Sequence, residues 1–499
     1  MVLSHSDIEK IYKTLRDNAF LSFDKKNYLQ SLDHIVFATR WAYQLNFQYV
    51  DEKLEHLIKN VADSCLPKLK IDSCFESRFV LLDTHGLDNR GLTQQYIRAF
   101  MAMGVEFLYI SVSCQRSKCV DIVKELEGYE RAKILLYEDE KTDYLEKAID
   151  ILSEIKLYQP TKLFLHLMPW DVVSLLISYS IQGVIKYNIN LTDHAFWLGA
   201  SFIDYNFEFR AYGKTVSLEK RHLKQEQLLY LPYYPILPKN KIEFQGFPIE
   251  AKDKIVIFTG GAFYKMFGNN DLFFKILDEL LDLSENAVVL VAGIGDKYTM
   301  NEKLAHLRNR HRIMLIGNRR DINEVFKACD VYLDTYPIRG GLMEQYASLY
   351  EKPILAYSDF QNFGDVQESM LCRFGNGVCG YNSWQCFIDY ARKILEDVAF
   401  RREEGLKNKQ LVPNVSDFNS NFMQLMTTHQ NVYNWDFMQV SYDKVKDLYL
   451  EVETLYTHTA VRCLMKNLKL KVIRYFPQYI FYFFQQLLAI LYSRLVLKK

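Results

Sequence analysis

Length, composition and charge limit the classes of protein that this sequence can encode. The chain has 499 residues, 49% of them hydrophobic and 24% charged, which excludes extended disorder and a polytopic membrane protein. Its 61 basic and 61 acidic residues give no net charge, so we expect no binding of nucleic acid. The length predicts about two to three domains. The nine cysteines follow no metal-ligand spacing, so we expect reduced thiols, no bound metal and a cytoplasmic protein.

Residues 1–75 are expected to form a helical extension at the N-terminus. Leu32, Val36 and Tyr43 recur at helical spacing, and a second helical stretch follows at 51–65. Apolar stripes of this kind usually pack against a neighbouring element. We therefore predict a packing or docking role for this extension, and no chemistry.

From residue 76 to residue 245, short β-branched or aromatic runs alternate with helical stretches. Such alternation predicts an α/β domain of the Rossmann-like, doubly wound type, with a parallel sheet. Its first unit runs from a strand at 78–83 through a helix at 92–104 to a strand at 105–113. The later strands are expected at 132–138, 162–167, 183–193 and 226–232.

A linker with four prolines separates this domain from a second Rossmann-like domain, which we place at 253–412. The strands of the second domain are expected at 254–260, 287–293, 312–317, 330–335 and 352–357. Two doubly wound domains in tandem should enclose a cleft between the carboxyl ends of their sheets, where ligands of such folds bind.

Residues 413–455 are predicted to form helices that pack back across the domains, and 456–499 a basic, aromatic, amphipathic tail. From Leu455 to Lys499 the chain has eight basic residues and no acidic one. This asymmetry suggests an anionic membrane surface as the partner of an interfacial helix. Two alternatives stay open: a helix buried in a homo- or hetero-oligomer contact, and a helix that spans the membrane.

Lys265 follows the predicted strand at 254–260 in a loop that contains Gly260 and Gly261. Glycines at this place permit positive φ and a close backbone approach to a bound anion. The lysine could then meet a diphosphate as a mobile positive charge. The alternative is an ordinary solvated lysine, because the loop matches neither the P-loop nor the dinucleotide fingerprint.

A second candidate anion site follows the predicted strand at 330–335. The turn contains Arg339, Gly340 and Gly341, and a helix is expected directly after it. Free N–H groups at a helix start, together with the positive end of the helix dipole, favour an anion there. Glu344 could accept hydrogen bonds from vicinal hydroxyls of a sugar, or it could simply be a carboxylate that the helix dipole favours.

The two domains, "GGAFYK" after the first strand of the second domain, "VLVAGIGD" after its second strand and "DVYLDTYPIRGGLMEQYASLYEKPIL" at its end together resemble a GT-B fold glycosyltransferase of the bacterial surface-polysaccharide type. The loop is also weakly similar to the protein O-GlcNAc transferase and adhesin glucosyltransferase branch. The resemblance covers about residues 78–450. It does not decide between a retaining and an inverting reaction, because only one glutamate of the pair found in many retaining members is present.

What the resemblance implies for the second domain is a nucleotide-sugar site. The donor substrate would be a UDP- or GDP-linked sugar, and no cofactor would be bound. The diphosphate would lie at Lys265, and phosphate and ribose would lie at Arg339, Gly340, Gly341 and Glu344.

The N-terminal domain should then bind the acceptor and supply a base that removes the proton of the acceptor hydroxyl. His85, His166 and His194 stand at predicted strand ends, and each could instead be a structural histidine. We rank His194 first as the catalytic residue and His85 second. Asp193 is a further catalytic candidate, but neighbours on a strand point to opposite faces, so the sequence predicts no dyad between Asp193 and His194.

Three further polar residues stand in the aromatic stretch "FIDYNFEFRAYG". We interpret this stretch as a loop that lies over the acceptor or the donor sugar, with His166 as an additional acceptor contact. The polar residues are Asp204, Glu208 and Arg210.

These observations predict an enzyme that transfers a hexosyl or N-acetylhexosaminyl group from a nucleoside diphosphate sugar to a glycan, a lipid-linked or a protein acceptor. The expected setting is bacterial surface-polysaccharide assembly at the inner face of the cytoplasmic membrane. Two alternatives remain. The first is a non-catalytic GT-B partner subunit that binds a nucleotide sugar or an acceptor but has no working base. The second is a sugar-nucleotide epimerase, which would need paired carboxylates in the cleft.

Overall fold

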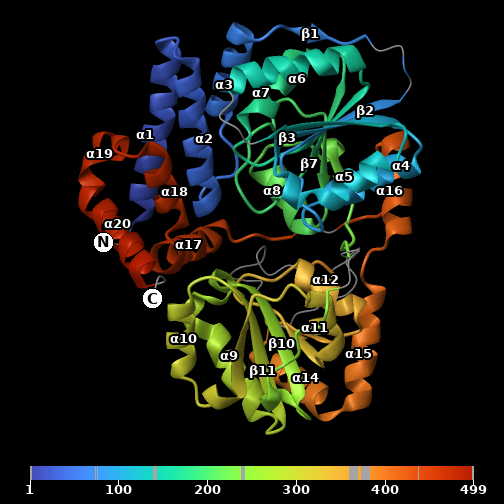
Figure 1. Cartoon of the computed structure of the whole chain (residues 1–499), viewed down its shortest axis with the longest axis vertical. Coiled ribbons are helices and arrows are strands. Elements are labelled where there is room, and N and C mark those ends of the chain that lie inside the picture. The colour runs from blue at the N-terminus through green and yellow to red at the C-terminus, as the bar shows by residue number, and fades with distance from the viewer. Residues whose placement is uncertain are drawn as a thin grey trace.

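Two α/β domains are stacked along the long axis of the molecule, with a bundle of helices from both ends of the chain beside one of them (Figure 1). Each domain contains one large parallel sheet. The predicted pair of Rossmann-like domains is therefore confirmed. The structure, a computed structural model, describes the side chains up to residue 488 and the backbone of residues 3–496 except 73–74, 76, 139–142, 238–241, 359–368, 372–382 and 436–437.

The N-terminal domain has a seven-stranded sheet in the order β4-β3-β2-β5-β7-β8-β9. Four consecutive apolar residues bury the central strand β2 on both faces, as a parallel sheet covered by helices requires. The strands are β2 (Arg78–Asp83), β3 (Glu106–Cys114), β4 (Ala132–Glu138), β5 (Lys162–His166), β7 (Ile185–Ile189), β8 (Tyr205–Glu208) and β9 (Leu228–Tyr230). The helices are α4 (Thr93–Ala102), α5 (Val120–Glu127), α6 (Tyr144–Tyr158), α7 (Val172–Ser180) and α8 (Ala211–Glu219).

The register of this sheet gathers polar residues at one edge. Asp83, the last residue of β2, lies opposite Ser111 of β3 and His166 of β5. Because all these strands are parallel, the loops that follow them leave the sheet at the same carboxyl edge, where doubly wound folds bind their ligands.

Residues 205–208 form the interior strand β8, so the prediction of a loop over the substrate was wrong. Asn206 of β8 accepts a hydrogen bond from Asn188 of β7 at 2.7 Å, and the carboxylate of Glu208 accepts bonds from Asn190 at 2.9 and 3.0 Å. The polar side chains of this strand thus pair with polar side chains of its neighbour. The sequence pattern hid the strand because two of its three buried positions, Asn206 and Glu208, are polar.

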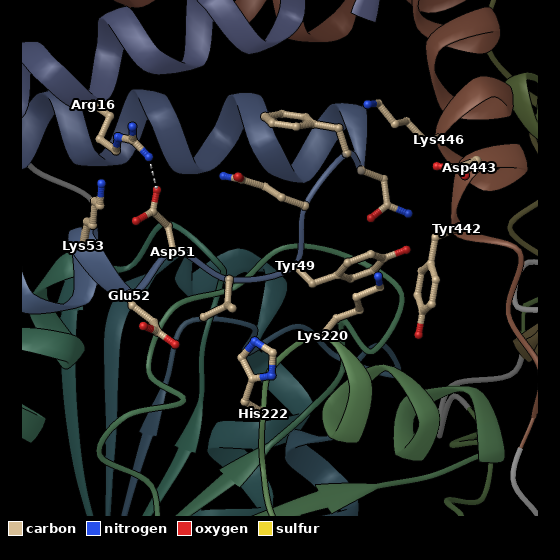
Figure 2. A pocket seen from close by; sticks show the side chains of 14 residues that line it. Arg16, Tyr49, Asp51, Glu52, Lys53, Lys220, His222, Tyr442, Asp443 and Lys446 are labelled. Atoms are coloured by element: carbon tan, nitrogen blue, oxygen red, sulfur yellow. Dashed lines mark hydrogen bonds and ion pairs between the residues drawn. The ribbon is translucent and has the colours of Figure 1, made fainter.

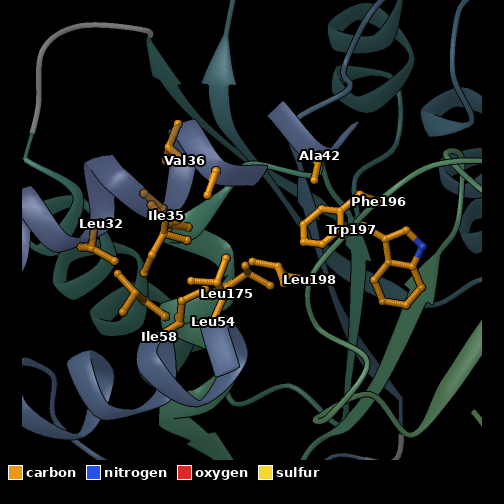
Figure 3. Close-up of a cluster of buried hydrophobic side chains, with 14 of the residues drawn as sticks. Leu32, Ile35, Val36, Ala42, Leu54, Ile58, Leu175, Phe196, Trp197 and Leu198 are labelled. Atoms are coloured by element: carbon orange, nitrogen blue, oxygen red, sulfur yellow. The ribbon is translucent and has the colours of Figure 1, made fainter. Parts of the chain in front are cut away.

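The N-terminal extension shares one hydrophobic core with the N-terminal domain (Figure 3). Side chains of α2 and α3 meet Leu175 of α7 in this core, and the short β1 adds a parallel pair to β6. At the start of α1, Ser4 and Asp7 form a reciprocal capping box. The elements are α1 (His5–Asp24), α2 (Tyr28–Leu45), α3 (Glu52–Cys65), β1 (Leu69–Lys70) and β6 (Ile181–Gln182).

The C-terminal domain has a five-stranded sheet in the order β12-β11-β10-β13-β14. Its strands are β10 (Ile255–Ala262), β11 (Ala287–Ile294), β12 (Ile313–Gly317), β13 (Val331–Leu333) and β14 (Ile354–Leu355). Its helices are α9 (Leu272–Asp282), α10 (Lys297–Ala305), α11 (Ile322–Ala328), α12 (Leu342–Leu349), α14 (Trp384–Glu396) and α15 (Val398–Gln410). All five strands coincide with predicted ones.

After the C-terminal domain, two helices return the chain to the N-terminal domain. In α16 (Val415–Thr428), Phe422 packs on Phe100 of α4, so this helix belongs to the core of the N-terminal domain. The next helix, α17 (Tyr442–Val452), touches both domains: Lys446 pairs with Glu9 of α1 at 3.1 Å, and Leu448 packs on Ile338 of the C-terminal domain.

The tail consists of α18 (Thr459–Leu468), α19 (Lys471–Tyr475) and α20 (Ile480–Val496). One side of it is buried against the N-terminal extension, where Phe476 and Tyr482 join the core and the Tyr479 hydroxyl donates to Asp7 at 2.8 Å. The opposite side leaves Phe481 83% exposed. Among the helices of the described residues, none combines the length and the hydropathy that a bilayer crossing requires.

Candidate active site

Gly260 and Gly261 lie in the last part of β10, and neither has the positive φ that the sequence suggested. They pair with Ala292 and Gly293 of β11. A Cβ at position 293 would lie 2.0 Å from the Gly261 oxygen, and the φ of Gly293 is +155°. The glycines at this edge therefore allow the two strand ends to approach closely, and they bring the backbone after β10 to the carboxyl edge of the sheet.

Lys265 lies directly beyond β10, against the turn that contains Arg339. Its Nζ donates to the Arg339 carbonyl oxygen at 3.1 Å, and its own carbonyl oxygen accepts from the Ile338 N–H at 3.4 Å. The two predicted anion-binding segments, 74 residues apart in sequence, are therefore in contact. The lysine is half-buried, and its ammonium retains donors for a ligand, since it has three N–H groups.

The turn before α12 has a fixed backbone. The Gly340 N–H donates to Asp334 Oδ1 at 2.8 Å, and a Cβ on Gly340 would lie 2.6 Å from the Tyr332 hydroxyl. Gly341 has a φ of +40° and forms the N-cap of α12 without a side-chain cap. Glycine at both positions lets the chain turn sharply into the helix. The positively polarised N-terminus of α12 therefore begins a few residues after Arg339, the residue that Lys265 contacts.

Arg339 is buried, with 5% of its surface exposed, and carboxylates surround its guanidinium. Its Nε donates to Asp334 at 2.8 Å, another nitrogen is paired with Glu344, and a third donates to Ser358 at 3.3 Å. This arrangement neutralises its charge within the protein. Arg339 therefore stabilises the turn through contacts in the protein interior. Its predicted direct contact with a phosphate stays a prediction.

Glu344 is fully buried in the same network. Its Oε2 accepts bonds from the Ser369 hydroxyl at 2.8 Å and from the Met370 N–H at 3.0 Å. Burial raises the pKa of Glu344 to about 7, although the nearby Arg339 favours the charged form. With these partners the carboxylate faces protein groups, so its predicted contact with ribose hydroxyls also stays a prediction.

Contacts at the junction bring this turn close to the N-terminal domain. In α12, the Gln345 side chain donates to the carbonyl oxygen of Tyr233 at 3.0 Å. The Tyr346 hydroxyl donates to the carbonyl oxygen of Ile236 at 2.8 Å. Burial raises the pKa of Tyr233, on which the charges of Arg210 and Glu344 from opposite domains both act. Arg210 and Glu344 therefore lie near the same tyrosine.

Asp193 and His194 form a pair, contrary to the expectation that they point apart. They lie in a turn after β7 rather than on a strand, and His194 Nδ1 is 3.2 Å from Asp193 Oδ1. Arg210 binds the same carboxylate at 2.6 and 3.0 Å. Burial alone would raise the pKa of Asp193, but the Arg210 charge and the hydrogen bonds outweigh it and lower that pKa. The His194 side chain is 34% exposed, so an oriented imidazole reaches the surface.

His85 and His166 are enclosed, with ring centroids 4.7 Å apart. His166 Nδ1 is 3.1 Å from Asp83 Oδ1, and the His85 ring is 3.1 Å from the Leu167 carbonyl oxygen. Burial lowers the pKa of His85 to about 3, so its ring is neutral near pH 7. Both histidines therefore lie in a buried cluster around Asp83 beneath the carboxyl edge of the sheet.

Asp204 is an exposed residue directly before β8, and Glu208 is buried at the end of that strand. The Asp204 carboxylate accepts from the Lys186 N–H at 2.7 Å. Burial raises the pKa of Glu208 to about 7, against the effect of the Arg221 charge. Of the three residues predicted to cover a sugar, only Arg210 contacts the Asp193–His194 pair.

A pocket of about 500 Å³ lies at the carboxyl edge of β2, β3 and β5. Arg40 of α2 lines it and stacks over Trp170 at 4.6 Å, and Lys147 and Asp171 contribute charges. Within the described part of the chain, no carboxylate lies within 4.0 Å of Arg40. The sequence prediction missed this pocket because it assigned α2 to packing only.

The pocket also lies close to the Lys265 loop. Tyr43 of α2 packs edge-on against Trp170 at 5.5 Å. Burial raises the pKa of Tyr43 to about 12, and Tyr264, the residue before Lys265, contributes to this increase. Trp170, which lines the pocket, thus packs on a tyrosine that is within electrostatic range of the segment that follows β10. In the described residues, no cluster of three or more His, Cys, Asp or Glu side chains could hold a metal ion.

Comparison with known proteins identifies the architecture. No protein-family model matches the chain, and no curated protein matches its sequence. A variant of the Thermobaculum terrenum O-GlcNAc transferase superposes with a TM-score of 0.51 and 14% identity, covering 85% of this chain and 81% of that one. HepE of Anabaena gives 0.50 and 12%, over 70% of this chain and 99% of that one.

TarM of S. aureus gives a TM-score of 0.50 and 9% identity, over 72% of this chain and 100% of the other. Similarity at this level of identity shows the fold. The resemblance in the sequence and the superpositions agree: the chain has the GT-B fold of glycosyltransferases.

Proposed function

We propose that this chain transfers a sugar from a nucleoside diphosphate sugar to a glycan, lipid-linked or protein acceptor, in bacterial surface-polysaccharide assembly. The main support is the contact between Lys265 and the glycine turn that starts α12, at the carboxyl edge of the second sheet of a GT-B fold. An ammonium and a helix start together stabilise the negative charge that develops on a diphosphate leaving group. The Anabaena HepE structure contains UDP-glucose, which supports a UDP-sugar as the donor.

The experiment is to incubate the purified chain with UDP- and GDP-linked glucose, galactose, N-acetylglucosamine and mannose. We expect one of them to raise the melting temperature and to release nucleoside diphosphate. Stabilisation without release, across a panel of acceptors, would instead assign the partner-subunit role. Conversion to an epimer would assign an epimerase. The absence of any response to all these donors would contradict the proposal.

We propose that His194 is the base and that Asp193 orients it. Of the three candidate histidines, His194 is the exposed one, and its Nδ1 contacts a buried carboxylate that Arg210 also binds. His194→Gln is expected to lower kcat by about 10²–10⁴-fold, the usual contribution of a general base. The melting temperature should not change, because the ring is partly exposed. The measurement is steady-state transfer at saturating donor.

The matched control is His311→Gln, an exposed histidine of the C-terminal domain, which should keep the wild-type kcat. Wild-type kcat in the His194 variant would exclude this residue as the base. The acceptor would lie in the pocket of Arg40 and Trp170, which opens at the same edge of the N-terminal sheet as the turn that holds His194.

We also propose that the tail places the enzyme at the inner face of an anionic membrane. Its outward side combines exposed apolar residues with exposed basic ones, and no acidic residue occurs from Leu455 on. Leu470, for example, is 82% exposed. Exposed apolar residues that gather on one surface mark a site of protein or membrane interaction. Apolar burial and electrostatic attraction to anionic lipid add up in such helices. The exposed residues are Lys466, Lys469, Leu470, Lys471, Ile473, Arg474, Phe481, Phe484, Leu487 and Leu488.

The double variant Phe481→Ser/Phe484→Ser is expected to lower the affinity for phosphatidylglycerol vesicles by about tenfold or more, since each buried phenylalanine contributes roughly 1.5–3 kcal/mol. Co-sedimentation measures the bound fraction. Leu157→Ser, at an equally exposed apolar residue on α6, is the control and should bind as wild type does. Equal binding to phosphatidylcholine vesicles, or no binding to either kind, would contradict an anionic membrane as the partner.

A further inference from the structure

A separate pocket of about 560 Å³ lies where three distant segments meet: the α2–α3 connection, the end of α8 and the start of α17. Figure 2 shows Arg16 and Asp51 on one side of it, His222 and Lys220 below, and Tyr442 on the opposite side. A pocket of this size accommodates a small molecule. Neither the proposed base nor the Lys265 loop lines it.

The lining contains a buried carboxamide that has no partner. Asn46 forms the C-cap of α2 and is 1% exposed. Neither its Nδ2 nor its Oδ1 has a hydrogen-bond partner among the described residues. An unpaired buried polar group calls for an explanation, and a bound molecule is one that fits an amide beside a pocket. One amide supplies both donors and an acceptor, which suits a ligand with adjacent groups of both kinds.

The charges around this pocket are mixed and close to balanced: among the described residues, Lys53 and Lys220 have no ion pair, and neither have Glu52 and Asp443. Arg16 binds Asp51 at 3.2 Å, and Lys446 binds Glu9 at 3.1 Å. Lys220 lies over the Tyr442 ring at 4.2 Å, where its ammonium remains a donor at the edge of the pocket. A strongly anionic ligand would meet the unpaired carboxylates of Glu52 and Asp443 beside these lysines, whereas an uncharged ligand rich in hydroxyl groups would match the amide and the ammonium.

We propose that this pocket binds an uncharged saccharide unit, at a second site outside the transfer centre. A pair of vicinal hydroxyls can donate to Asn46 Oδ1 and accept from its Nδ2, and Lys220 can donate to a third oxygen. That this saccharide belongs to the acceptor or product glycan rests on the proposed function. The binding itself does not depend on it.

The geometry also connects this pocket to the transfer centre. Tyr49, a lining residue, lies 5.7 Å beneath the Arg221 guanidinium, and Arg221 donates to the Asp193 carbonyl oxygen at 2.9 Å. One arginine therefore separates the saccharide pocket from the turn that holds the proposed base. A glycan held in the pocket would keep its next units near that turn.

The test uses the full-length chain and saturation-transfer NMR with the methyl glycosides of glucose, galactose, mannose and N-acetylglucosamine, and with disaccharides of these sugars. We expect at least one sugar to bind to wild type. Asn46→Gly, which tolerates the φ of 47° at this position, should weaken binding by about tenfold through loss of the amide bonds. Lys220→Met, at an exposed position, should weaken binding as well and provides a second variant if the first one does not fold.

The control is Gln159→Gly, at another left-handed helix C-cap with a φ of 55°, which should bind as wild type does. The absence of saccharide binding to wild type, or undiminished binding in both pocket variants, would overturn the proposal. Displacement of the sugar by inorganic phosphate would also overturn it, because the ligand site would then be anionic. Sugar binding by a Lys265→Met chain that is inactive with every donor would support this site independently of the transferase proposal.

Discussion

Replacing Lys265 with methionine is expected to lower kcat/KM for sugar transfer by about 10²–10³-fold, the typical cost of removing one charged or hydrogen-bonding group that stabilises a developing anion. The change removes the ammonium and keeps the length of the side chain. The fold should remain intact, because the side chain is half-buried and its one described hydrogen bond is to the Arg339 carbonyl oxygen. Transfer rates and the donor-induced shift in melting temperature measure the effect.

Lys254→Met provides the control for charge. Lys254 is exposed just before β10, so its replacement removes one positive charge from the same strand without affecting the carboxyl edge. It should leave both measurements unchanged. If the Lys265 variant transferred sugar and responded to the donor as the Lys254 variant does, the donor site would have to be placed elsewhere.

Replacing Arg339 with methionine is expected to cost about 3–5 kcal/mol of the free energy of unfolding, because removing one partner leaves buried charges unpaired. Asp334 and Glu344 both lose their cation, and both are buried. The variant should also lose transfer activity, since the turn before α12 depends on this network. Urea denaturation and circular dichroism measure the change.

The cost should depend on pH. The pKa of Glu344 is about 7 in the folded chain, above the ordinary 4.5, so its contribution to stability is fully present below about pH 4.5 and is lost as the pH rises through 7. Without Arg339 the charged form is disfavoured still more. We therefore expect the variant to be less destabilised at pH 5 than at pH 8. A loss that is independent of pH would exclude an unpaired Glu344 as its cause.

Arg319→Met is the matched control, because Arg319 binds the buried carboxylate of Asp321 at 2.7 and 2.6 Å in the same domain. This change should also destabilise the chain. It should leave the kcat/KM of the folded fraction unchanged, because no contact joins this pair to the Lys265 segment in the part of the chain that the structure describes.

Strands were the most predictable part of the fold. Runs such as "RFVLLD" and "AVVLVAG" are apolar and bounded by turn residues, and they form β2 and β11. Strand ends then locate the functional edges, which is why Lys265, Arg339 and Gly340 could be assigned to one region from sequence alone. The contact between Lys265 and Arg339, across 74 residues, follows from the parallel pairing of β10 and β13.

Side-chain partners were much less predictable, since they depend on how each turn folds in three dimensions. Asp334 and Glu344 each lie five residues from Arg339, but the sequence does not show that the turn folds both carboxylates around the guanidinium. The pairing of His194 with Asp193 depends on a turn that the strand pattern did not reveal. Arg40 belongs to a helix whose apolar stripe concealed its pocket-facing role. In each case tertiary contacts decided the role of a residue whose local pattern allowed several.

The burial of Phe476 and Tyr482 against the first helices has a consequence for biosynthesis. A ribosome releases α1 and α2 several hundred residues before it releases α20, yet these segments complete one apolar core. Until α20 has emerged from the ribosome, the surface that later contacts the tail stays uncovered and open to chaperones. The amino-terminal half can therefore reach its final packing only after the last helices have emerged.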